Sequence, residues 1–448
     1  MILLVALLSL QDSDYSRRLG ELHHTLAEER RKIAEALEGM KAWGLARAEY
    51  QKLLRVEADD DEAKKKLRGE EAIPLQNERL TSETRARAAE LLSEFARVAS
   101  SACADLARWC DGHGMHEEAL SQWRFALFYS PTHGEALRTL GFWGVGAAAV
   151  DPLWKDVKWK ELISKADAGS VTTEMTEIEK KWSVKNNCRF TPSMQWEGVN
   201  VSQARLTTLA KLGEAELLFM RKLLGEEKLG FCVDRIVVMT GHESFVKYVE
   251  DFFSGPKSSK DLLKIMSGTE NVLRREFAMC VPEGDSKIAD SYISHSIPEF
   301  ALAATLGIDD YDKTPAWLKE GIGCTAELLF RDCAEASCIA MPESTMTGGI
   351  PWSLSDRWND NLGNLVAQGK DCPMGDLACV DLNAMKGDQR AKSASVVTFL
   401  ALRWPQGFRG LIAEARKNPK DVSAQFGSGL GLSTEEFDEF WRRWVRAK

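Results

Sequence analysis

The pattern that most limits the fold is the helical spacing of apolar residues in the first third of the chain. From Asp14 to about Phe142, apolar residues recur every three or four positions among many Ala, Leu, Glu, Lys and Arg residues. This spacing gathers apolar side chains on one helix face, and these residue types favour helices. Proline occurs here only at Pro74 and Pro131. We therefore expect helices to dominate this region.

Length and composition set the class of protein. The chain has 448 residues, 44% of them hydrophobic, which suggests two or three globular domains. The 58 Lys and Arg against 67 Asp and Glu give a net charge of -9, so we expect no attraction to nucleic acid. No apolar run approaches the roughly 20 residues that cross a bilayer, so we expect no integral membrane segment.

The first residues, MILLVALLSL, are almost wholly apolar and precede polar QDSD. Residues 1–12 are therefore interpreted as a signal peptide, which predicts an exported protein: periplasmic, envelope-associated or secreted. A buried helix start or a misplaced initiator is the alternative, because no Lys or Arg precedes the run and no small-x-small cleavage site follows it. Two cysteine pairs, Cys333 with Cys338 and Cys372 with Cys379, are spaced so that a bridge could close a short loop; they support export only weakly.

One stretch within residues 14–150 resembles a tetratricopeptide repeat. Small or aromatic residues stand where two antiparallel helices must approach, and a proline closes the unit: Ala107, Gly114, Ala119, Trp123, Ala126 and Pro131. An earlier copy keeps Ala46 and Tyr50 at an offset of 73 residues, slightly more than two 34-residue repeats, so residues 70–100 are expected to depart from strict periodicity. The resemblance implies an α-helical solenoid that binds protein on a concave face; a helical brace is the alternative.

After residue 150 the pattern changes. Residues 151–177 read as a connector, and residues 178–446 as an α+β domain with a small sheet against several helices. Strands are predicted at 234–241 and 275–281. Helices are predicted at 203–224, 286–305, 315–330, 391–404 and 434–446.

This order of elements resembles the peptidase MA-like metallopeptidases, the gluzincin branch of the zincins. The most specific fragment is PAWLKEG, because a Trp-Leu-x-Glu-Gly near a helix start supplies the third zinc ligand in that family. The resemblance assigns that role to Glu320. The family also places a Tyr or His near the start of the later helix, and the corresponding position in this chain is near Arg390.

The rest of the family's zinc motif is degraded. Where His-Glu-x-x-His is expected, the chain has Ser291, Tyr292 and, at the last position, His295. A serine is a poor zinc ligand, and a tyrosine with an ordinary pKa of about 10 cannot replace the carboxylate base. His295 and Glu320 remain as a remnant metal pair, and two ligands seldom hold zinc tightly.

Other residues offer a partial rescue or a simpler interpretation. Cys324, one turn after Glu320, is a conceivable third ligand, whereas a buried cysteine is usually a small hydrophobe. Ser296 and Glu299 resemble a capping box around Pro298, which would interrupt the helix that presents the motif. In that interpretation Glu299 is a cap and His295 a hydrogen-bonded core residue.

The sequence therefore predicts a tetratricopeptide-like helical domain followed by a degenerate zincin-like domain. We expect a non-catalytic protein that binds a protein or peptide and needs no cofactor. The alternative is an active zinc metallopeptidase that uses His295, Glu320 and an unexpected ligand. A purely structural component is a third possibility.

Overall fold

A computed structural model describes residues 2–68, 72–74, 81–254, 257–263, 268–281, 286–307, 314–333 and 358–447. The chain forms two compact units. Unit 1 is Met1–Pro152 with Ala447–Lys448, and unit 2 is Leu153–Arg446. Each unit is described by itself.

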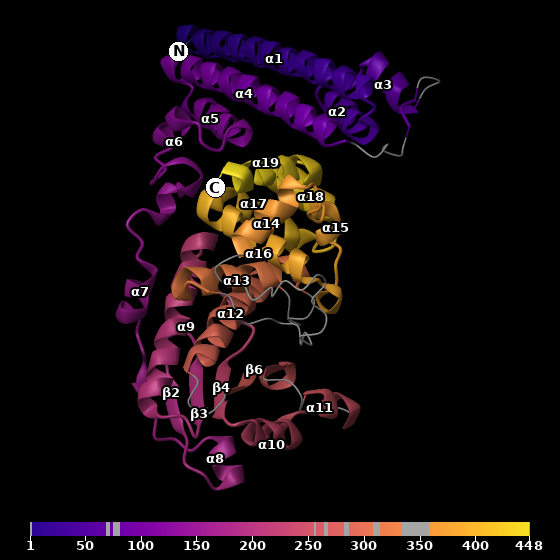
Figure 1. The fold of residues 1–448 in the computed structure, drawn as a ribbon. Coiled ribbons are helices and arrows are strands. Elements are labelled where there is room, and N and C mark those ends of the chain that lie inside the picture. The colour runs from indigo at the N-terminus through magenta and orange to yellow at the C-terminus, as the bar shows by residue number, and fades with distance from the viewer. Residues whose placement is uncertain are drawn as a thin grey trace. The chain divides into compact units, whose positions relative to one another are not determined.

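Unit 1 is helical, and its helices repeat. The elements are α1 (Ile2–Gly39), α2 (Trp43–Val56), α3 (Asp61–Arg68), α4 (Ser82–Gly112), α5 (His116–Tyr129) and α6 (Gly134–Thr139) (Figure 1). The ends of α1 and α4, both ends of α2 and α5, and the starts of α3 and α6 are each 73 residues apart. The unit is therefore built from two copies of a module with one long helix followed by two shorter ones.

This duplication explains the 73-residue offset in the sequence. Instead of an irregular 34-residue repeat between the two copies, the described part of residues 70–100 belongs largely to α4, a single helix of 31 residues. Thr81 caps its start by accepting a hydrogen bond from the Thr84 N–H at 3.1 Å. Gly114, at φ +76°, allows the tight turn into α5.

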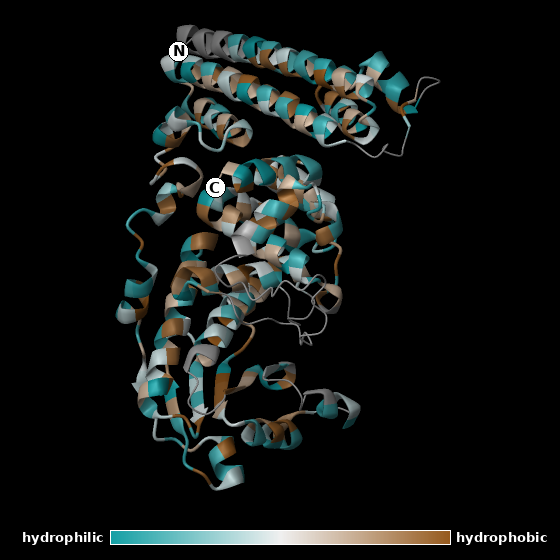
Figure 2. Cartoon of the chain, in the orientation of Figure 1, coloured by the Kyte–Doolittle hydropathy of each residue, from teal (hydrophilic) through white to brown (hydrophobic). Residues whose placement is uncertain are grey.

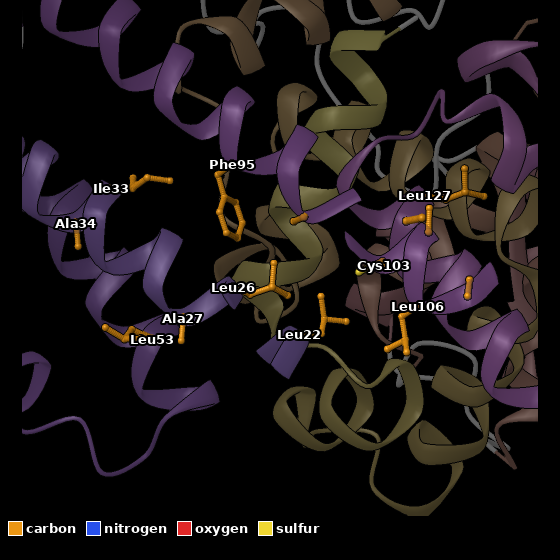
Figure 3. Packing of buried hydrophobic residues seen from close by; sticks show 14 of the residues in the cluster. Leu22, Leu26, Ala27, Ile33, Ala34, Leu53, Phe95, Cys103, Leu106 and Leu127 are labelled. Atoms are coloured by element: carbon orange, nitrogen blue, oxygen red, sulfur yellow. The ribbon is translucent and has the colours of Figure 1, made fainter. Parts of the chain in front are cut away.

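The core of unit 1 lies between the long and short helices. Figure 3 shows Leu22, Leu26 and Phe95 from α1 and α4 among the buried side chains. Ala46 and Tyr50 in α2, and Ala119 and Trp123 in α5, are at most 1% exposed. Hydrophobic and hydrophilic residues alternate along α1 and α4 (Figure 2), as expected of helices with one buried face. The small and aromatic residues in both copies therefore serve close helix packing.

Unit 2 contains a six-stranded mixed sheet. Its strands lie in the order β1 (Ser170–Val171), β2 (Asn187–Phe190), β3 (Gln195–Val199), β4 (Arg235–Thr240), β6 (Glu276–Val281) and β5 (Gly268–Asn271). The pairs β3–β4 and β4–β6 are parallel, and the other pairs are antiparallel. The two predicted strands, β4 and β6, are adjacent inner strands of the sheet, and both are largely buried.

Helices cover both faces of this sheet. On one face, α8 (Glu177–Trp182) and α10 (His242–Phe252) pack Ile178 and Tyr248 against alternate residues of β4, such as Val237. On the other face lie α9 (Gln203–Leu224) and α12 (Ser286–Thr305), where Gly213 leaves room for the Trp196 ring of β3. The sheet thus positions α12.

The remaining helices complete unit 2: α7 (Trp159–Lys165) lies beside α9, α11 (Lys257–Leu263) lies beside α10, and the others follow α12 in the chain (Figure 1). These others are α13 (Ala316–Arg331), α14 (Trp358–Ala367), α15 (Met374–Leu377), α16 (Gly387–Arg403), α17 (Pro405–Lys417), α18 (Val422–Leu430) and α19 (Thr434–Ala447). The predicted helices at 203–224 and 286–305 are confirmed at both ends. The other three predicted helices begin and end within four residues of the observed ones. A helical region followed by helices with a small mixed sheet is therefore confirmed.

Two other sequence-based expectations concern membranes and disulfides. Among the described residues, every helix is too short or too polar to span a membrane. Cys372 and Cys379 are both free, so the suggested bridge between them is not formed. Cys338 lies outside the described residues.

Candidate functional site

The first component of the site is a pair of side chains on α12. His295 and Glu299 are one turn apart, and both are buried. The alternative interpretation, in which Ser296 begins a helix with Glu299 as its cap, is wrong, because α12 is continuous and holds Pro298 in its interior. An internal proline costs a helix about 3 kcal/mol, and the packing of α12 between α9 and α13 offsets this cost. The continuous helix turns Glu299 toward His295.

The second component is one face of α13. Glu320, Cys324 and Glu327 follow each other at intervals of four and three residues, so they share this face. All three are fully buried. Glu320 is the fifth residue of α13 and lies in its interior, which rules out a solvated first-turn acid. The face is directed at α12.

Two glycines let the neighbouring helices approach α13. A Cβ atom on Gly323 would lie 2.8 Å from both Nδ1 and the carbonyl oxygen of His295. A Cβ atom on Gly321 would lie 2.4 Å from a methyl carbon of Val397 and 2.7 Å from the carbonyl oxygen of Ser393, both on α16. Any larger residue would push the helices apart, so the Gly-Ile-Gly sequence after Glu320 is a packing requirement of the site.

Three carboxylates surround the His295 ring. Its Nδ1 lies 2.8 Å from Oε1 of Glu327, at hydrogen-bond distance. Its Nε2 lies 3.3 Å from Oε1 of Glu299 and 3.4 Å from Oε2 of Glu320. A carboxylate at Nδ1 fixes the ring orientation and favours a proton on that nitrogen. Nε2 then faces two acids with which it can share a proton or a metal ion.

Arg390 supplies the opposite charge. It lies in the first turn of α16, is buried, and donates its Nε–H to Oε1 of Glu320. Burial alone would raise the pKa of Glu320, but the charges of Arg390 and His295 outweigh it and hold that pKa well below its usual range. Burial likewise opposes the charged form of Arg390, yet Cys324 and Glu320 raise its pKa. The acid and the guanidinium therefore form a buried ion pair.

Cys324 lies beside this ion pair. Its Sγ atom is 3.8 Å from Oε1 of Glu320 and 3.6 Å from Nη2 of Arg390. Burial raises the pKa of the thiol, and this outweighs the attraction of Arg390 for a thiolate. A neutral thiol is a poor metal ligand.

A fourth acid, Glu216 on α9, lies close enough to Glu327 to feel its charge. Burial, with the nearby charge of Glu327, raises the pKa of Glu216 well above its usual range, and Ser294 opposes this only in part. Within the described residues, neither carboxylate oxygen of Glu216 has a hydrogen-bond partner of standard geometry, nor does the Ser294 hydroxyl. Burial therefore favours the neutral, protonated form of Glu216.

Two sets of groups converge closely enough to hold a metal ion. The first is His295, Glu299 and Glu320, and the second is His295, Cys324 and Glu327. Within each set the ligand atoms lie within 4.8 Å of one another. One imidazole and two carboxylates suit zinc and other divalent transition metals. In the first set, Arg390 already neutralises one of the two carboxylates.

Only some residues of this site were predicted from the sequence. His295 and Glu320 come together as proposed, while Ser291, one turn before His295, is buried and Tyr292 is partly exposed. His242 begins α10 and its Nδ1 lies 3.6 Å from the Cys280 thiol, among the residues on the opposite face of the sheet. Glu299, Glu327 and Glu216 were not identified as site residues. The four-residue spacing from His295 to Glu299 was the available signal for the first of these.

Comparison of the chain with protein-family models, with curated proteins and with solved structures gave no match. The class that the fold and the site define is therefore a two-unit protein with a buried His–Glu–Arg centre among helices that pack on a mixed sheet.

Proposed function

We propose that this protein is a non-catalytic binding protein whose second unit is a degenerate zincin-like domain. One observation carries the proposal: the buried guanidinium of Arg390 pairs with Glu320, the residue to which the family resemblance assigns the third zinc ligand. The positive charge that a metal would bring to this carboxylate is already supplied by the chain. A zinc ion at Glu320 would face a buried cation, which opposes its binding.

The second argument is that no carboxylate stands at the position of the general base. His295 and Glu299 share a helix face toward Glu320, which corresponds to a motif register four residues later than the one through Ser291. The general base of the motif is the residue after the first metal ligand. In this register that residue is Ser296, which follows His295, and in the earlier register it is Tyr292, which follows Ser291. Neither side chain replaces a carboxylate base for water activation at neutral pH. The proposal therefore does not depend on the choice of register.

The binding role rests on exposed apolar side chains in unit 1. After α6 the chain forms an isolated bridge between Trp143 and Val150, joined by backbone hydrogen bonds of 3.0 and 2.9 Å. Trp143 is 54% exposed and Val145 is 84% exposed. Trp is enriched among the residues that contribute most to protein-binding surfaces, and Val145, two residues later, adds exposed apolar area. We therefore propose a protein or peptide partner for this loop.

The test of this role is a pull-down with the full chain as bait, using wild type and a Trp143→Ser/Val145→Ser double variant. The proposal expects the variant to lose partners that wild type retains. A Val184→Ser variant, changed at an exposed aliphatic residue in unit 2, is the matched control and should retain them. Identical partner sets for wild type and the double variant would contradict a role for this loop.

A metal-binding centre is the second candidate function. It is favoured by the distances from His295 Nε2 to Glu299 and Glu320, which bring three possible ligands of a divalent metal together. In that case the third ligand is Glu299, and an active zinc peptidase would have to use this set. Chelator-sensitive proteolysis that disappears in a Glu299→Gln variant would support this candidate.

A further inference from the structure

Unit 2 contains a pocket whose lining includes none of the residues around His295. Its volume is about 450 Å³, within the usual range for small-molecule sites. It lies between α7 and the second half of α9, and the turn after α9 contributes Gly225. The pocket therefore provides a second possible binding site.

Three aromatic rings that pack against one another form an apolar wall of the pocket. The ring centroids of Trp154, Trp159 and Phe219 lie 5.2 to 5.7 Å from one another, so each ring contacts the other two. The Trp154 Nε1–H donates to the carbonyl oxygen of Ala401 at 2.7 Å, which fixes this ring. Leu218, on α9, is 42% exposed although most of that helix is buried. An apolar ligand that packs on this wall would cover the exposed Leu218 side chain.

The lining of the pocket contains two cationic side chains, Lys222 and Arg221. Within the described part of the chain, neither Lys222 nor Arg221 forms an ion pair with a carboxylate. The Lys222 ammonium lies 5.7 Å from the centre of the Trp154 ring. Arg221 donates from Nη2 to Ser193 Oγ at 3.1 Å, and its buried Nε has no hydrogen-bond partner among the described residues.

The acids of the lining do not cancel these two cations. Glu226 is engaged by Arg416, whose Nη2 donates to Glu226 Oε1 at 2.7 Å. Among the described residues, this leaves Glu227 as the acid of the lining without such a cation. Two cations of the lining, Lys222 and Arg221, stand against this one acid, and Arg221 reaches the carboxylate of Glu214 only through the Ser193 hydroxyl. The pocket is therefore apolar along one wall and carries an excess of positive charge.

We propose that this pocket binds a small organic monocarboxylate with an apolar body. The alkyl or aryl part packs on Trp154, Trp159 and Leu218, and the carboxylate accepts hydrogen bonds from Lys222 and Arg221. An apolar cation is disfavoured by the same charges. The ligand class follows from the pairing of an aromatic wall with unpaired cations and does not depend on the proposed function of the other sites.

Calorimetric titration of the full chain with decanoate, below its micellar concentration, tests this proposal. The expected result is saturable binding of one equivalent, about tenfold tighter than binding of decanol, because a charged acceptor strengthens the hydrogen bonds. Decyltrimethylammonium should bind more weakly than decanol. Absence of saturable decanoate binding, or equal affinity for all three probes, would overturn the proposal.

Two variants localise the binding. Lys222→Gln should weaken decanoate binding about tenfold and leave decanol binding unchanged, and Leu218→Asp should abolish both. Lys228→Gln, an exposed lysine outside the pocket, is the matched control and should bind as wild type. Near-ultraviolet circular dichroism confirms that each variant is folded. Decanoate affinity that is the same in wild type, Lys222→Gln and Leu218→Asp would place the ligand elsewhere and refute the assignment.

Discussion

Arg390 donates its Nε–H to Oε1 of Glu320, joining the first turn of α16 to the interior of α13. Both side chains are buried, so this ion pair has been removed from water. Such a pair adds little to stability as a whole, but removing one partner leaves an unpaired charge in the interior. We therefore expect a single substitution in this pair to destabilise the protein more than a double substitution that removes both charges.

Replacing Arg390 alone should be strongly destabilising. Arg390→Met leaves Glu320 buried beside Glu299 without its cation, and we expect a loss of about 3–5 kcal/mol in the free energy of unfolding. Urea denaturation followed by circular dichroism measures this loss. The Arg390→Met/Glu320→Gln double variant should recover much of it, because the buried charge is gone. An Arg390→Met variant as stable as wild type would show that the ion pair does not form.

Glu216 should make stability fall as pH rises. An unfolded glutamate titrates near pH 4.3, whereas burial raises the pKa of folded Glu216 well above that value. The folded state thus holds a proton that the unfolded state has lost, and its stability decreases from about pH 4 up to the folded pKa. Glu216→Gln removes this titration. The variant should melt at a higher temperature than wild type at pH 8 and at a similar temperature at pH 4.

Glu214→Gln is the matched control for this experiment. Glu214 is also buried on α9, but it accepts hydrogen bonds from the backbone N–H and hydroxyl of Ser193 at 3.2 and 2.9 Å. Its neutralisation should destabilise the protein at pH 8. If Glu216→Gln is also less stable than wild type at pH 8, Glu216 is charged in the folded protein and the account of this residue fails.

Gly323 should tolerate no side chain. In Gly323→Ala the new Cβ would lie 2.8 Å from the backbone oxygen of His295, so α12 and α13 must separate. We expect a loss of about 1–3 kcal/mol in unfolding free energy. Gly363→Ala in α14 is the control, because no atom lies within 4 Å of its new Cβ. It should be neutral or stabilising by up to about 1 kcal/mol. Equal effects of the two substitutions would contradict the close approach of the helices.

Local sequence patterns predict much of the fold. The ends of α9 and α12 and the inner strands β4 and β6 follow from the sequence pattern, because each element buries one face or is wholly buried. The short edge strands β1 and β5 carry little pattern of their own and depend on pairing with a neighbour. The 73-residue offset was visible in Ala46 and Ala119, but the sequence did not reveal that each module contains a helix of more than 30 residues.

The site was harder to predict because its contacts are non-local. Glu320 and Arg390 are 70 residues apart in the sequence, and no spacing rule connects them. Glu299 stood at helical spacing from His295, yet Pro298 favoured a helix start at this point. Tertiary packing on both sides of α12 overrides that local preference.

The central claim is that Arg390 takes the place of a metal ion at Glu320. Elemental analysis of wild-type protein, purified without chelator and dialysed against a small excess of zinc followed by metal-free buffer, tests it most directly. The account predicts well under one equivalent of bound zinc and no change on His295→Ala. One full equivalent of zinc, lost in His295→Ala, would contradict it.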